Sequence, residues 1–261
     1  MRVLNPSLDL DRFFARLGRA RERVLFVDYD GTLAPFHPRP ERAAPYPRVA
    51  ALLNEIGRAP RTRVVMVSGR KLADLAKPLE QIRSHDVWGS HGWQRGKPGE
   101  KAVSFQPRPA ERRKLDAAEA AIGGVRALGA RVERKAGSLA VHWRGLDALS
   151  ADVVRERLRE AWKPFERRGL ECLEFDGGVE LRARSRTKGS AVSAALAESS
   201  PRAVCAYLGD DHTDEDAFEA VGARGIGVLV RPSLRPTRAD LWLEPPRELV
   251  EFLRRWRGTP R

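Results

Sequence analysis

Two aspartates directly follow a strongly apolar run near the start of the chain. In FVDYDGTLAPF, residues 26–36, Asp28 and Asp30 come straight after the apolar residues 24–27. Side chains at i and i+2 of an extended segment point the same way, so both carboxylates can converge on one point. One interpretation is structural, because Asp-Gly is a common turn dipeptide and Asp30 with Gly31 could simply end a strand. The other is chemical: like charges repel unless a cation lies between them, and Mg²⁺ binds one or two protein carboxylates together with water and a substrate phosphate.

A second group of carboxylates follows another apolar run. In YLGDDHTDEDAF, residues 207–218, Asp210 and Asp211 end the run and Asp214 comes just behind them. Thr213 could cap a helix, and Asp214 could equally serve the positive end of that helix or a functional site. Capping does not account for Asp210 and Asp211, which precede the cap. In an open α/β sheet the ligand site lies beyond the carboxyl ends of the strands, and we expect both acidic groups at that edge.

Two further stretches could bind an anionic group beside these carboxylates. In VVMVSGRKLADL, residues 64–75, an apolar run ends at Ser68, Gly69 and Arg70. The Ser68 hydroxyl and the backbone N–H groups near Gly69 could hold an anion at a helix start, although many strand-to-helix turns look like this. Lys188 in SRTKGSAV could be an ordinary exposed lysine, yet its compact ammonium suits a phosphate crowded among carboxylates. Taken together, these residues predict a magnesium-dependent phosphoryl site.

The segments around these residues predict an α/β fold. Strands that are apolar throughout and alternate with helices are typical of a parallel sheet covered on both faces. We therefore expect a doubly wound core. Its strands are expected at 24–27, 63–67, 86–88, 203–208 and 226–230, and its helices at 7–21, 49–56 and 72–82 and from residues 187, 213 and 246.

The middle of the chain has a different pattern and predicts an inserted α+β domain. Alternation such as LAVHWR, residues 139–144, suits an antiparallel sheet with one polar face. We expect helices at 110–127 and 149–168, and strands at 130–134, 139–144, 171–175 and 179–184. The predicted domains are a core formed by 1–101 and 185–261 and a cap formed by 102–184.

Composition limits the class of protein. The net charge of +13 would suit nucleic acid, but most of it is arginine spread along predicted helices and mixed with acidic residues. We find no apolar run long enough to cross a bilayer and no signal-peptide pattern, and we expect a cytoplasmic protein. The two cysteines, Cys172 and Cys205, stand alone in apolar segments and are interpreted as buried thiols.

The motifs DYDGTL, SGR, TKG and GDDHTDED, in this order, resemble the four motifs of the haloacid dehalogenase superfamily. The resemblance implies a Rossmann-like core with a C2-type cap, and it implies that Asp28 is the nucleophile and forms an aspartyl phosphate. Asp30 would protonate the leaving alcohol and then activate water. Mg²⁺ would be held by Asp28, by the main-chain carbonyl of Asp30 and by Asp210, with Asp211 and Asp214 in support. An acid at the second position is typical of phosphatases and phosphomutases.

The same resemblance implies the phosphate-binding residues, which would be Ser68, Gly69, Arg70 and Lys188.

Over nearly the whole chain the sequence also resembles the trehalose-6-phosphate phosphatase family. The likeness rests on DYDGTLAP, SGR, GSHG, an E-x-K and then H-aromatic-R pattern in the cap, E-L-R before KG, and GDDHTDEDAF. It implies that Glu133, Lys135 and Glu180 bind sugar hydroxyls and that Arg144 reaches toward the phosphate or the proximal sugar. Taken alone, Glu133, Lys135, His142 and Arg144 could be charged groups on a solvated sheet.

The chain departs from this family's pattern at two positions. It has Ala183 where the family usually has proline and Trp143 where tyrosine is usual. Neither residue carries a proposed catalytic atom.

The expected function is hydrolysis of trehalose 6-phosphate with Mg²⁺ as cofactor. One alternative is another phosphatase of the superfamily, acting on sucrose or mannosyl-glycerate phosphates. A second is a basic nucleic-acid-binding protein on a degenerate phosphatase fold, which four intact motifs argue against. We expect a small-molecule substrate, no nucleic acid, no membrane and a monomer.

Overall fold

A computed structural model describes residues 1–37, 39–82, 86–175 and 177–259. The chain divides into two compact units. Unit 1 comprises Met1–Ser104 and Thr187–Arg261, and unit 2 comprises Phe105–Arg186. The predicted assignment of core and cap functions to 1–101 with 185–261 and to 102–184 stays a prediction.

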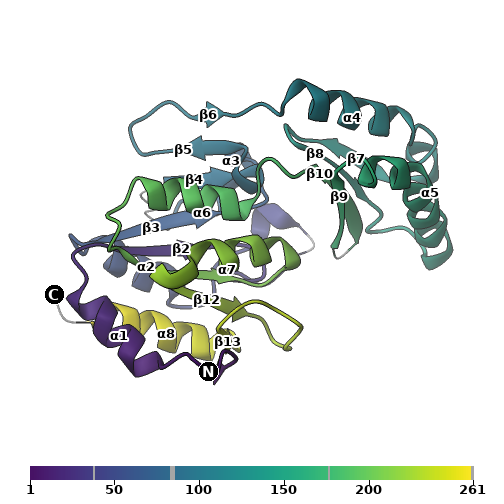
Figure 1. Cartoon of the computed structure of the whole chain (residues 1–261). Helices are drawn as coiled ribbons and strands as arrows, with labels where there is room; N and C mark the ends of the chain where they lie inside the picture. The colour runs from purple at the N-terminus through teal and green to yellow at the C-terminus, as the bar shows by residue number, and fades with distance from the viewer. Residues whose placement is uncertain (38, 83–85, 176, 260–261) are drawn as a thin grey trace. The chain divides into compact units, whose positions relative to one another are not determined.

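Unit 1 is built on a nine-stranded sheet in the order β1-β13-β12-β11-β2-β3-β4-β5-β6 (Figure 1). The six strands from β13 to β4 run parallel, while β1, β5 and β6 add antiparallel edges. The strands are β1 (Arg2–Val3), β2 (Arg23–Val27), β3 (Thr62–Val67), β4 (Asp86–Gly89), β5 (Gln94–Gly96), β6 (Val103–Ser104), β11 (Val204–Gly209), β12 (Gly225–Val230) and β13 (Leu241–Leu243). The chain leaves β2 toward β3 and β4 but later builds β11, β12 and β13 on the other side. The strand order therefore switches between β2 and β11.

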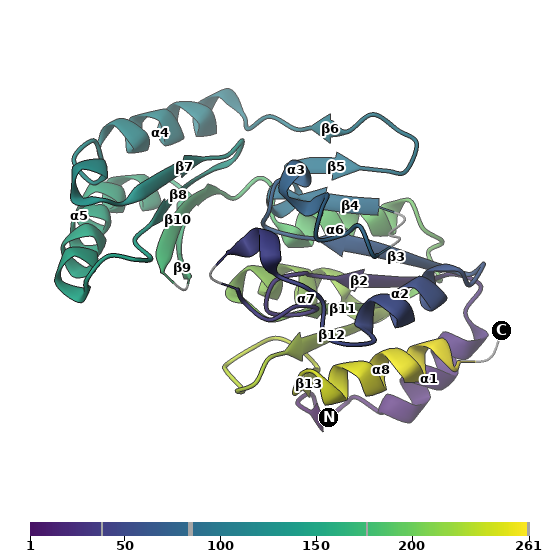
Figure 2. The ribbon, with the colours of Figure 1, turned by 180° about the vertical axis from the view of Figure 1, so that it is seen from behind.

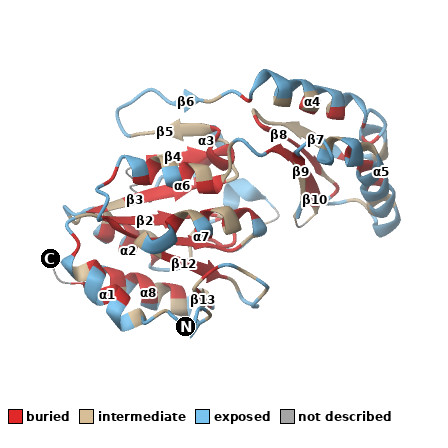
Figure 3. Cartoon of the chain, viewed as in Figure 1, coloured by how far each residue is buried: buried red, intermediate tan, exposed pale blue. Residues whose placement is uncertain are grey.

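Helices cover both faces of this sheet. The helices of unit 1 are α1 (Leu10–Arg19), α2 (Val49–Gly57), α3 (Leu72–Leu75), α6 (Lys188–Ala197), α7 (Glu215–Val221) and α8 (Arg247–Arg257). The helices α6 and α7 lie on one face (Figure 1), and α2 and α8 lie on the other (Figure 2). Figure 3 shows the strands buried between them. The expected doubly wound α/β core is confirmed.

The two faces are set by alternation along β2. Leu25 and Val27 belong to the apolar cluster that contains α2 and α8. Phe26 points the other way and stacks on Tyr207 of β11, whose ring meets Phe218 of α7. Asp28 continues the Phe26 side by the period of two. The strand thus delivers its first carboxylate to the face covered by α6 and α7.

The helix expected at 72–82 is wrong beyond its first turn. α3 ends at Leu75 and turns follow. Pro78 explains the difference, since proline lacks the N–H that a continuing helix needs and disfavours helical geometry in the residue before it. The short strands β1, β5, β6 and β13 were not predicted, because two or three residues carry no readable period.

Unit 2 is a four-stranded antiparallel sheet in the order β7-β8-β10-β9, with two long helices. Its elements are α4 (Pro109–Ala120), β7 (Arg131–Arg134), β8 (Ser138–His142), α5 (Ala148–Glu166), β9 (Leu170–Phe175) and β10 (Gly178–Ala183). Its helices bury Leu115, Val154, Leu158 and Trp162. α4 is shorter than the predicted 110–127, because Gly123 and Gly124 disfavour its continuation. The expected α+β insertion is confirmed.

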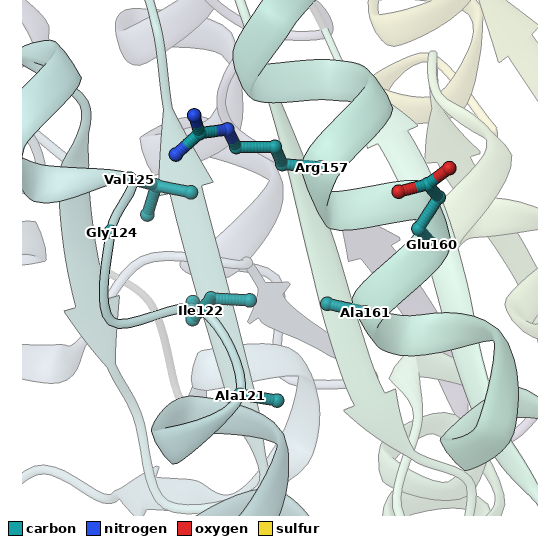
Figure 4. A pocket seen from close by; sticks show the side chains of 7 residues that line it. All are labelled: Ala121, Ile122, Gly124, Val125, Arg157, Glu160 and Ala161. Atoms are coloured by element: carbon teal, nitrogen blue, oxygen red, sulfur yellow. The ribbon is translucent and has the colours of Figure 1, made fainter.

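A pocket of about 410 Å³ lies in unit 2 between the chain after α4 and one side of α5 (Figure 4). It is lined by Ala121, Ile122, Gly124, Val125, Arg157, Glu160 and Ala161. No predicted site residue is among them. Among the helices of the described ranges, none has the length and apolar character needed to span a membrane.

Candidate active site

The carboxylates of two adjacent strand ends meet in unit 1. Asp28 follows β2, Asp210 follows β11, and Asp214 lies in the 3₁₀ turn His212–Asp214 that precedes α7. Each of the three offers a carboxylate oxygen within 4.8 Å of the others, and all three residues are buried. The Asp28 N–H donates to the Leu208 carbonyl at 2.9 Å, which extends the pairing of the two strands up to the cluster. The geometry that the strand ends predicted is present.

Lys188, the first residue of α6, lies among these carboxylates. Its ammonium is 2.7 Å from Asp214 Oδ1 and 3.3 Å from Asp28 Oδ1. The lysine is only 3% exposed. Burial acts to lower the pKa of Lys188, but the charges of Asp214 and Asp28 outweigh it and raise the pKa, so the ammonium stays charged. The interpretation of Lys188 as an ordinary exposed lysine is therefore wrong.

Asp214 is held by donors on both of its oxygens. Oδ1 accepts from Lys188 and from the Tyr207 hydroxyl. Oδ2 accepts from the backbone N–H groups of Asp210 and Asp211, at 3.1 and 3.0 Å. A carboxylate with four donors is well satisfied and fixes the groups around it. No role was predicted for Tyr207 from the sequence. The available signal was the alternation of side chains along its strand, which places residues on one face or the other.

The charges in this cluster do not balance. With all three carboxylates ionised around the one ammonium, the cluster has two negative charges in excess. Burial raises the pKa of Asp28 to about 7; Lys188 opposes the rise, and the charges of Asp214 and Asp30 add to it. Burial, followed by the charges of Asp28 and Asp214, also raises the pKa of Asp210 well above its usual value. Hard oxygen donors with two excess negative charges fit a divalent cation such as Mg²⁺.

Gly31 allows the two strand ends to approach this closely. Its φ is +80°, and a Cβ at this position would lie 2.0 Å from Asp210 Oδ2. Only glycine accepts both the left-handed backbone and this contact. Thr32, in the same turn, donates its hydroxyl to Asp210 Oδ1 at 3.2 Å. The turn after β2 therefore contacts the acid after β11 directly.

Asp30 does not join the cluster of three carboxylates. Arg70 donates to both of its oxygens, with Nε 2.6 Å from Oδ2 and Nη2 on Oδ1. The same guanidinium donates to the Pro40 carbonyl at 2.9 Å and lies 5.4 Å from the centre of the Tyr29 ring. Burial acts to lower the pKa of Arg70, but Asp30 raises it overall. Arg70, which was predicted to bind phosphate, thus pairs with Asp30, the predicted general acid.

The turn of Ser68 and Gly69 is supported by residues 90–92. Ser68 is buried, and its carbonyl accepts from the His91 N–H at 3.0 Å. A Cβ on Gly69 would lie 2.7 Å from His91 Cε1, so the imidazole packs directly on the turn. Ser90 and His91 have φ values of 50° and 54°, which non-glycine residues rarely adopt. Backbone strain of this kind is found mainly where it positions a functional site. The GSHG stretch was noted in the sequence, but this supporting role was not predicted.

Asp211 is the remaining predicted acid of unit 1. Its carboxylate accepts from the His212 N–H at 2.6 Å and caps the short 3₁₀ turn. It is not one of the three clustered carboxylates. Its backbone N–H donates to the Asp214 carboxylate, and its side chain accepts from the Asp214 backbone in a capping box.

In unit 2, the predicted sugar-binding residues share part of one sheet face. The register places Glu133 of β7 and Glu180 of β10 opposite the same residue of β8, Ala140. Lys135 Nζ lies 3.1 Å from Glu180 Oε1, which also accepts from the Ser138 hydroxyl at 2.6 Å. Burial acts to lower the pKa of Lys135, but Glu180 and Glu133 raise it overall. The sheet face is therefore a connected polar cluster, in which Glu180 is buried and Glu133 and Lys135 are partly buried.

Arg144 follows the end of β8. β8 ends at His142, so the strand predicted to reach residue 144 is two residues too long and Arg144 is exposed beyond it. His142 Nε2 lies 3.3 Å from Glu133 Oε2. Trp143, the departure from the family pattern, is buried under the Arg155 guanidinium, which lies 5.2 Å from the ring centre.

Comparisons with known proteins give a family match and similar sequences. Residues 26–243 match the family model described as trehalose-phosphatase. The chain is similar to "Probable trehalose-phosphate phosphatase 4" of Oryza sativa subsp. japonica, with 30% identity over 256 residues that cover 92% of this chain and 67% of the rice protein. It is also similar to the "Bifunctional trehalose-6-phosphate synthase/phosphatase" of Thermoproteus tenax, with 31% identity over 252 residues. That match covers 96% of this chain but only 34% of the longer relative.

Among solved structures, the chain is similar to the C-terminal domain of C. albicans trehalose-6-phosphate phosphatase. The TM-score is 0.79, and the match covers 99% of both chains at 22% identity. This likeness extends the agreement in fold to the whole chain.

Proposed function

The chain belongs to the trehalose-phosphatase family, and from that premise we propose that it hydrolyses trehalose 6-phosphate to trehalose and phosphate. The observation that carries the proposal is the cluster of Asp28, Asp210 and Asp214 around Lys188 at the ends of β2 and β11. A buried anionic nucleophile beside a buried ammonium suits transfer of a phosphoryl group, in which positioning and charge stabilisation supply most of the catalysis.

Asp28 is the proposed nucleophile. One of its carboxylate oxygens attacks phosphorus, the bond from phosphorus to the sugar oxygen breaks, and an aspartyl phosphate forms. Asp30 donates a proton to the departing sugar oxygen. Asp30, now a carboxylate, then takes a proton from water as the water oxygen attacks phosphorus and releases Asp28. One carboxyl group thus serves first as acid and then as base.

We propose Mg²⁺ as the cofactor. The Asp28 carboxylate, the Asp30 main-chain carbonyl and Asp210 would hold it, with Asp211 and Asp214 in support. When bound, it would screen the phosphate charge from the anionic nucleophile. The excess of two negative charges in the cluster supports a divalent ion. Because Asp214 already has four donors, we assign it to holding Lys188 and the 210–211 turn.

The phosphate is proposed to bind Ser68, the N–H groups at Gly69, Lys188 and Arg70. When Asp28 becomes bonded to phosphorus, the Lys188 ammonium would change partner from Asp28 to a phosphate oxygen. Arg70 donates to both carboxylate oxygens of Asp30. Its charge would therefore act next to the leaving oxygen and not at the far side of the phosphate.

The cap residues are proposed to recognise the sugar. Glu133, Lys135 and Glu180 offer a set of charged acceptors and donors on one sheet, and such groups can each satisfy pairs of vicinal hydroxyls. Arg144 is exposed and would bind the phosphate or the proximal sugar. We further propose a cytoplasmic location, because a doubly charged sugar phosphate does not cross a bilayer unaided, and we propose a monomer.

The experiment that tests the substrate is a panel of sugar phosphates with saturating Mg²⁺. Phosphate release is measured for trehalose 6-phosphate, sucrose 6-phosphate, mannosyl-glycerate phosphate and glucose 6-phosphate. We expect the highest kcat/KM for trehalose 6-phosphate. A higher value for any other member would contradict the proposed substrate while leaving the proposed chemistry in place.

A further inference from the structure

The segment after β12 contacts the turn that carries Asp210. Arg235 lies in this segment, and its side chain is 9% exposed. Its Nε is 3.3 Å from the Asp210 carbonyl oxygen and its Nη2 is 2.7 Å from the Asp211 carbonyl oxygen. Arg231 adds a second donor to the Asp210 carbonyl, also at 3.3 Å. Two consecutive peptide carbonyls next to the acidic cluster are therefore bound by guanidinium groups.

Glu215 holds Arg235 from the other side. This first residue of α7 accepts from Arg235 Nη1, from the Thr237 hydroxyl at 2.9 Å and from the Arg238 N–H at 2.7 Å. Its position at a helix start fits the favourable place for an acid. Three donors from residues 235–238, however, give it a second task. It anchors the whole segment that supplies Arg235.

The backbone of Asp210 and Asp211 is consequently held from two sides. Its N–H groups donate to Asp214, inside the site. Its carbonyls accept from Arg235, outside the site. Rotation of the peptide unit between Asp210 and Asp211 would break a bond on each side, since its N–H donates to Asp214 and its carbonyl accepts from Arg235. The direction of the Asp210 carboxylate depends on that backbone.

Arginine suits this position better than lysine. The task needs three donors in fixed directions, toward two neighbouring carbonyls and one carboxylate. A guanidinium presents five N–H donors in a rigid plane, whereas an ammonium is a single rotating point.

We propose that Arg235, anchored by Glu215, is a positioning residue that sets the Asp210 carboxylate for the divalent cation. The inference rests on the proposed function, because it assumes that a divalent cation binds this cluster. Partners that orient a metal-binding side chain commonly change metal affinity by about 10- to 100-fold when removed. Arg235 touches neither the cluster carboxylates nor the phosphate-binding turn in the contacts described, so its effect would act through the backbone.

The test measures Mg²⁺ affinity in two independent ways. The melting temperature of the substrate-free protein is followed against MgCl₂ concentration, and the Mg²⁺ dependence of phosphate release is measured at saturating trehalose 6-phosphate. For Arg235→Met we expect the Mg²⁺ midpoint to rise by about 10- to 100-fold in both assays. The rate at saturating Mg²⁺ should stay within a few-fold of wild type. The Mg²⁺ midpoint of Arg235→Lys should lie between those of wild type and Arg235→Met.

Arg238→Met is the matched control. It lies in the same segment, but its guanidinium goes to Glu219 at 3.1 Å and is largely exposed. Its midpoint should equal that of wild type. Glu215→Gln, which keeps the size of the side chain, should raise the midpoint in the same direction as Arg235→Met and covers the case in which Arg235→Met fails to fold.

An Arg235→Met or Glu215→Gln protein that melts at a lower temperature yet keeps the wild-type Mg²⁺ midpoint would overturn the inference, because that result is packing alone. A wild-type protein whose melting temperature ignores Mg²⁺ would overturn it too. Absence of trehalose 6-phosphate turnover in a protein that still shows the midpoint shifts would instead bear only on the proposed substrate.

Discussion

Arg70 holds both carboxylate oxygens of Asp30, so the proposed general acid is clamped by the third residue of the SGR turn. The pair links the turn after β3 to the turn after β2. Because Arg70 also donates to the Pro40 carbonyl, the clamp is itself fixed.

Arg70→Met should therefore impair the acid more than the binding of phosphate. We expect a loss of about 100-fold in kcat for trehalose 6-phosphate, because a misplaced acid no longer protonates a poor leaving group. p-Nitrophenyl phosphate needs little help from an acid, and its kcat should change by only a few-fold. Asp30→Asn provides the reference for this pattern. Equal losses on both substrates would mean that Arg70 acts on the phosphate alone and does not position Asp30.

Asp28→Asn should abolish turnover of both substrates, since an amide cannot form the acyl phosphate. The metal-free variant should melt no lower than wild type, because the substitution removes one of three clustered negative charges and Lys188 keeps Asp214 at 2.7 Å. Phosphate release and thermal melting are the measurements. Asp74→Asn, at an exposed position of α3, serves as control. Wild-type-like rates in Asp28→Asn would exclude a covalent route through this residue.

Lys188→Met should destabilise the metal-free protein. Removing one partner of a buried ion pair leaves uncompensated charge, which costs about 3–5 kcal/mol. Urea unfolding without metal measures this loss, and Mg²⁺ should restore part of it. The exposed Lys77→Met variant should unfold like wild type. A Lys188→Met protein with unchanged stability would mean that the three carboxylates are protonated without their lysine.

The acid dependence of stability should include a contribution from Glu198. Hydrogen bonds from Arg95, the largest cause, lower the pKa of Glu198 from 4.5 to about 2. A folded-state pKa below the unfolded one stabilises the protein above pH 4.5, and this contribution is lost as the pH falls toward 2. The effect is small, since the Glu198 side chain is 41% exposed.

Urea unfolding of wild type and Glu198→Gln from pH 6 to pH 3 measures that contribution. The difference in unfolding free energy should be largest at pH 6 and shrink toward pH 3. Glu251→Gln, at an exposed position of α8, should show no such trend. A difference that grows as the pH falls would contradict the assigned sign.

Glu133→Ala tests the proposed sugar recognition. We expect KM for trehalose 6-phosphate to rise by about tenfold or more, in line with the loss of a charge-assisted hydrogen bond, while KM for p-nitrophenyl phosphate stays unchanged. Glu174→Ala, an exposed acid of β9 in the same sheet, is the control. Equal effects on both substrates would mean that Glu133 does not contact the sugar.

The sequence predicted the parts of the site that depend on strand direction. Asp28 and Asp210 could be placed together because parallel strands deliver their ends to one edge. The destination of Arg70 could not be predicted, because a long side chain reaches several partners and only the folded turn selects Asp30. The role proposed for Arg235 could not be predicted either, because it depends on main-chain carbonyl groups, which every residue has.

The errors in the fold have similar local causes. The spacing of apolar residues led to a predicted helix that continues past Leu75 to residue 82, although Pro78 is a helix-breaking signal. The edge strands β5 and β6 are too short to show alternation. The strained residues Ser90 and His91 were invisible, since their left-handed backbone is imposed by contacts with the turn at Ser68 and Gly69.

The contact between Gly31 and Asp210 ties folding and chemistry to the same atoms. A single methyl group at position 31 would collide with Asp210, the proposed metal ligand, and would also oppose the backbone of the turn. In a saturation library, selection for soluble expression and selection for growth on the enzyme's product should therefore both return glycine alone at this position. Evolution could change the sugar specificity through substitutions in the cap. Replacement of Gly31, in contrast, would disrupt the acidic cluster that every such phosphatase would need.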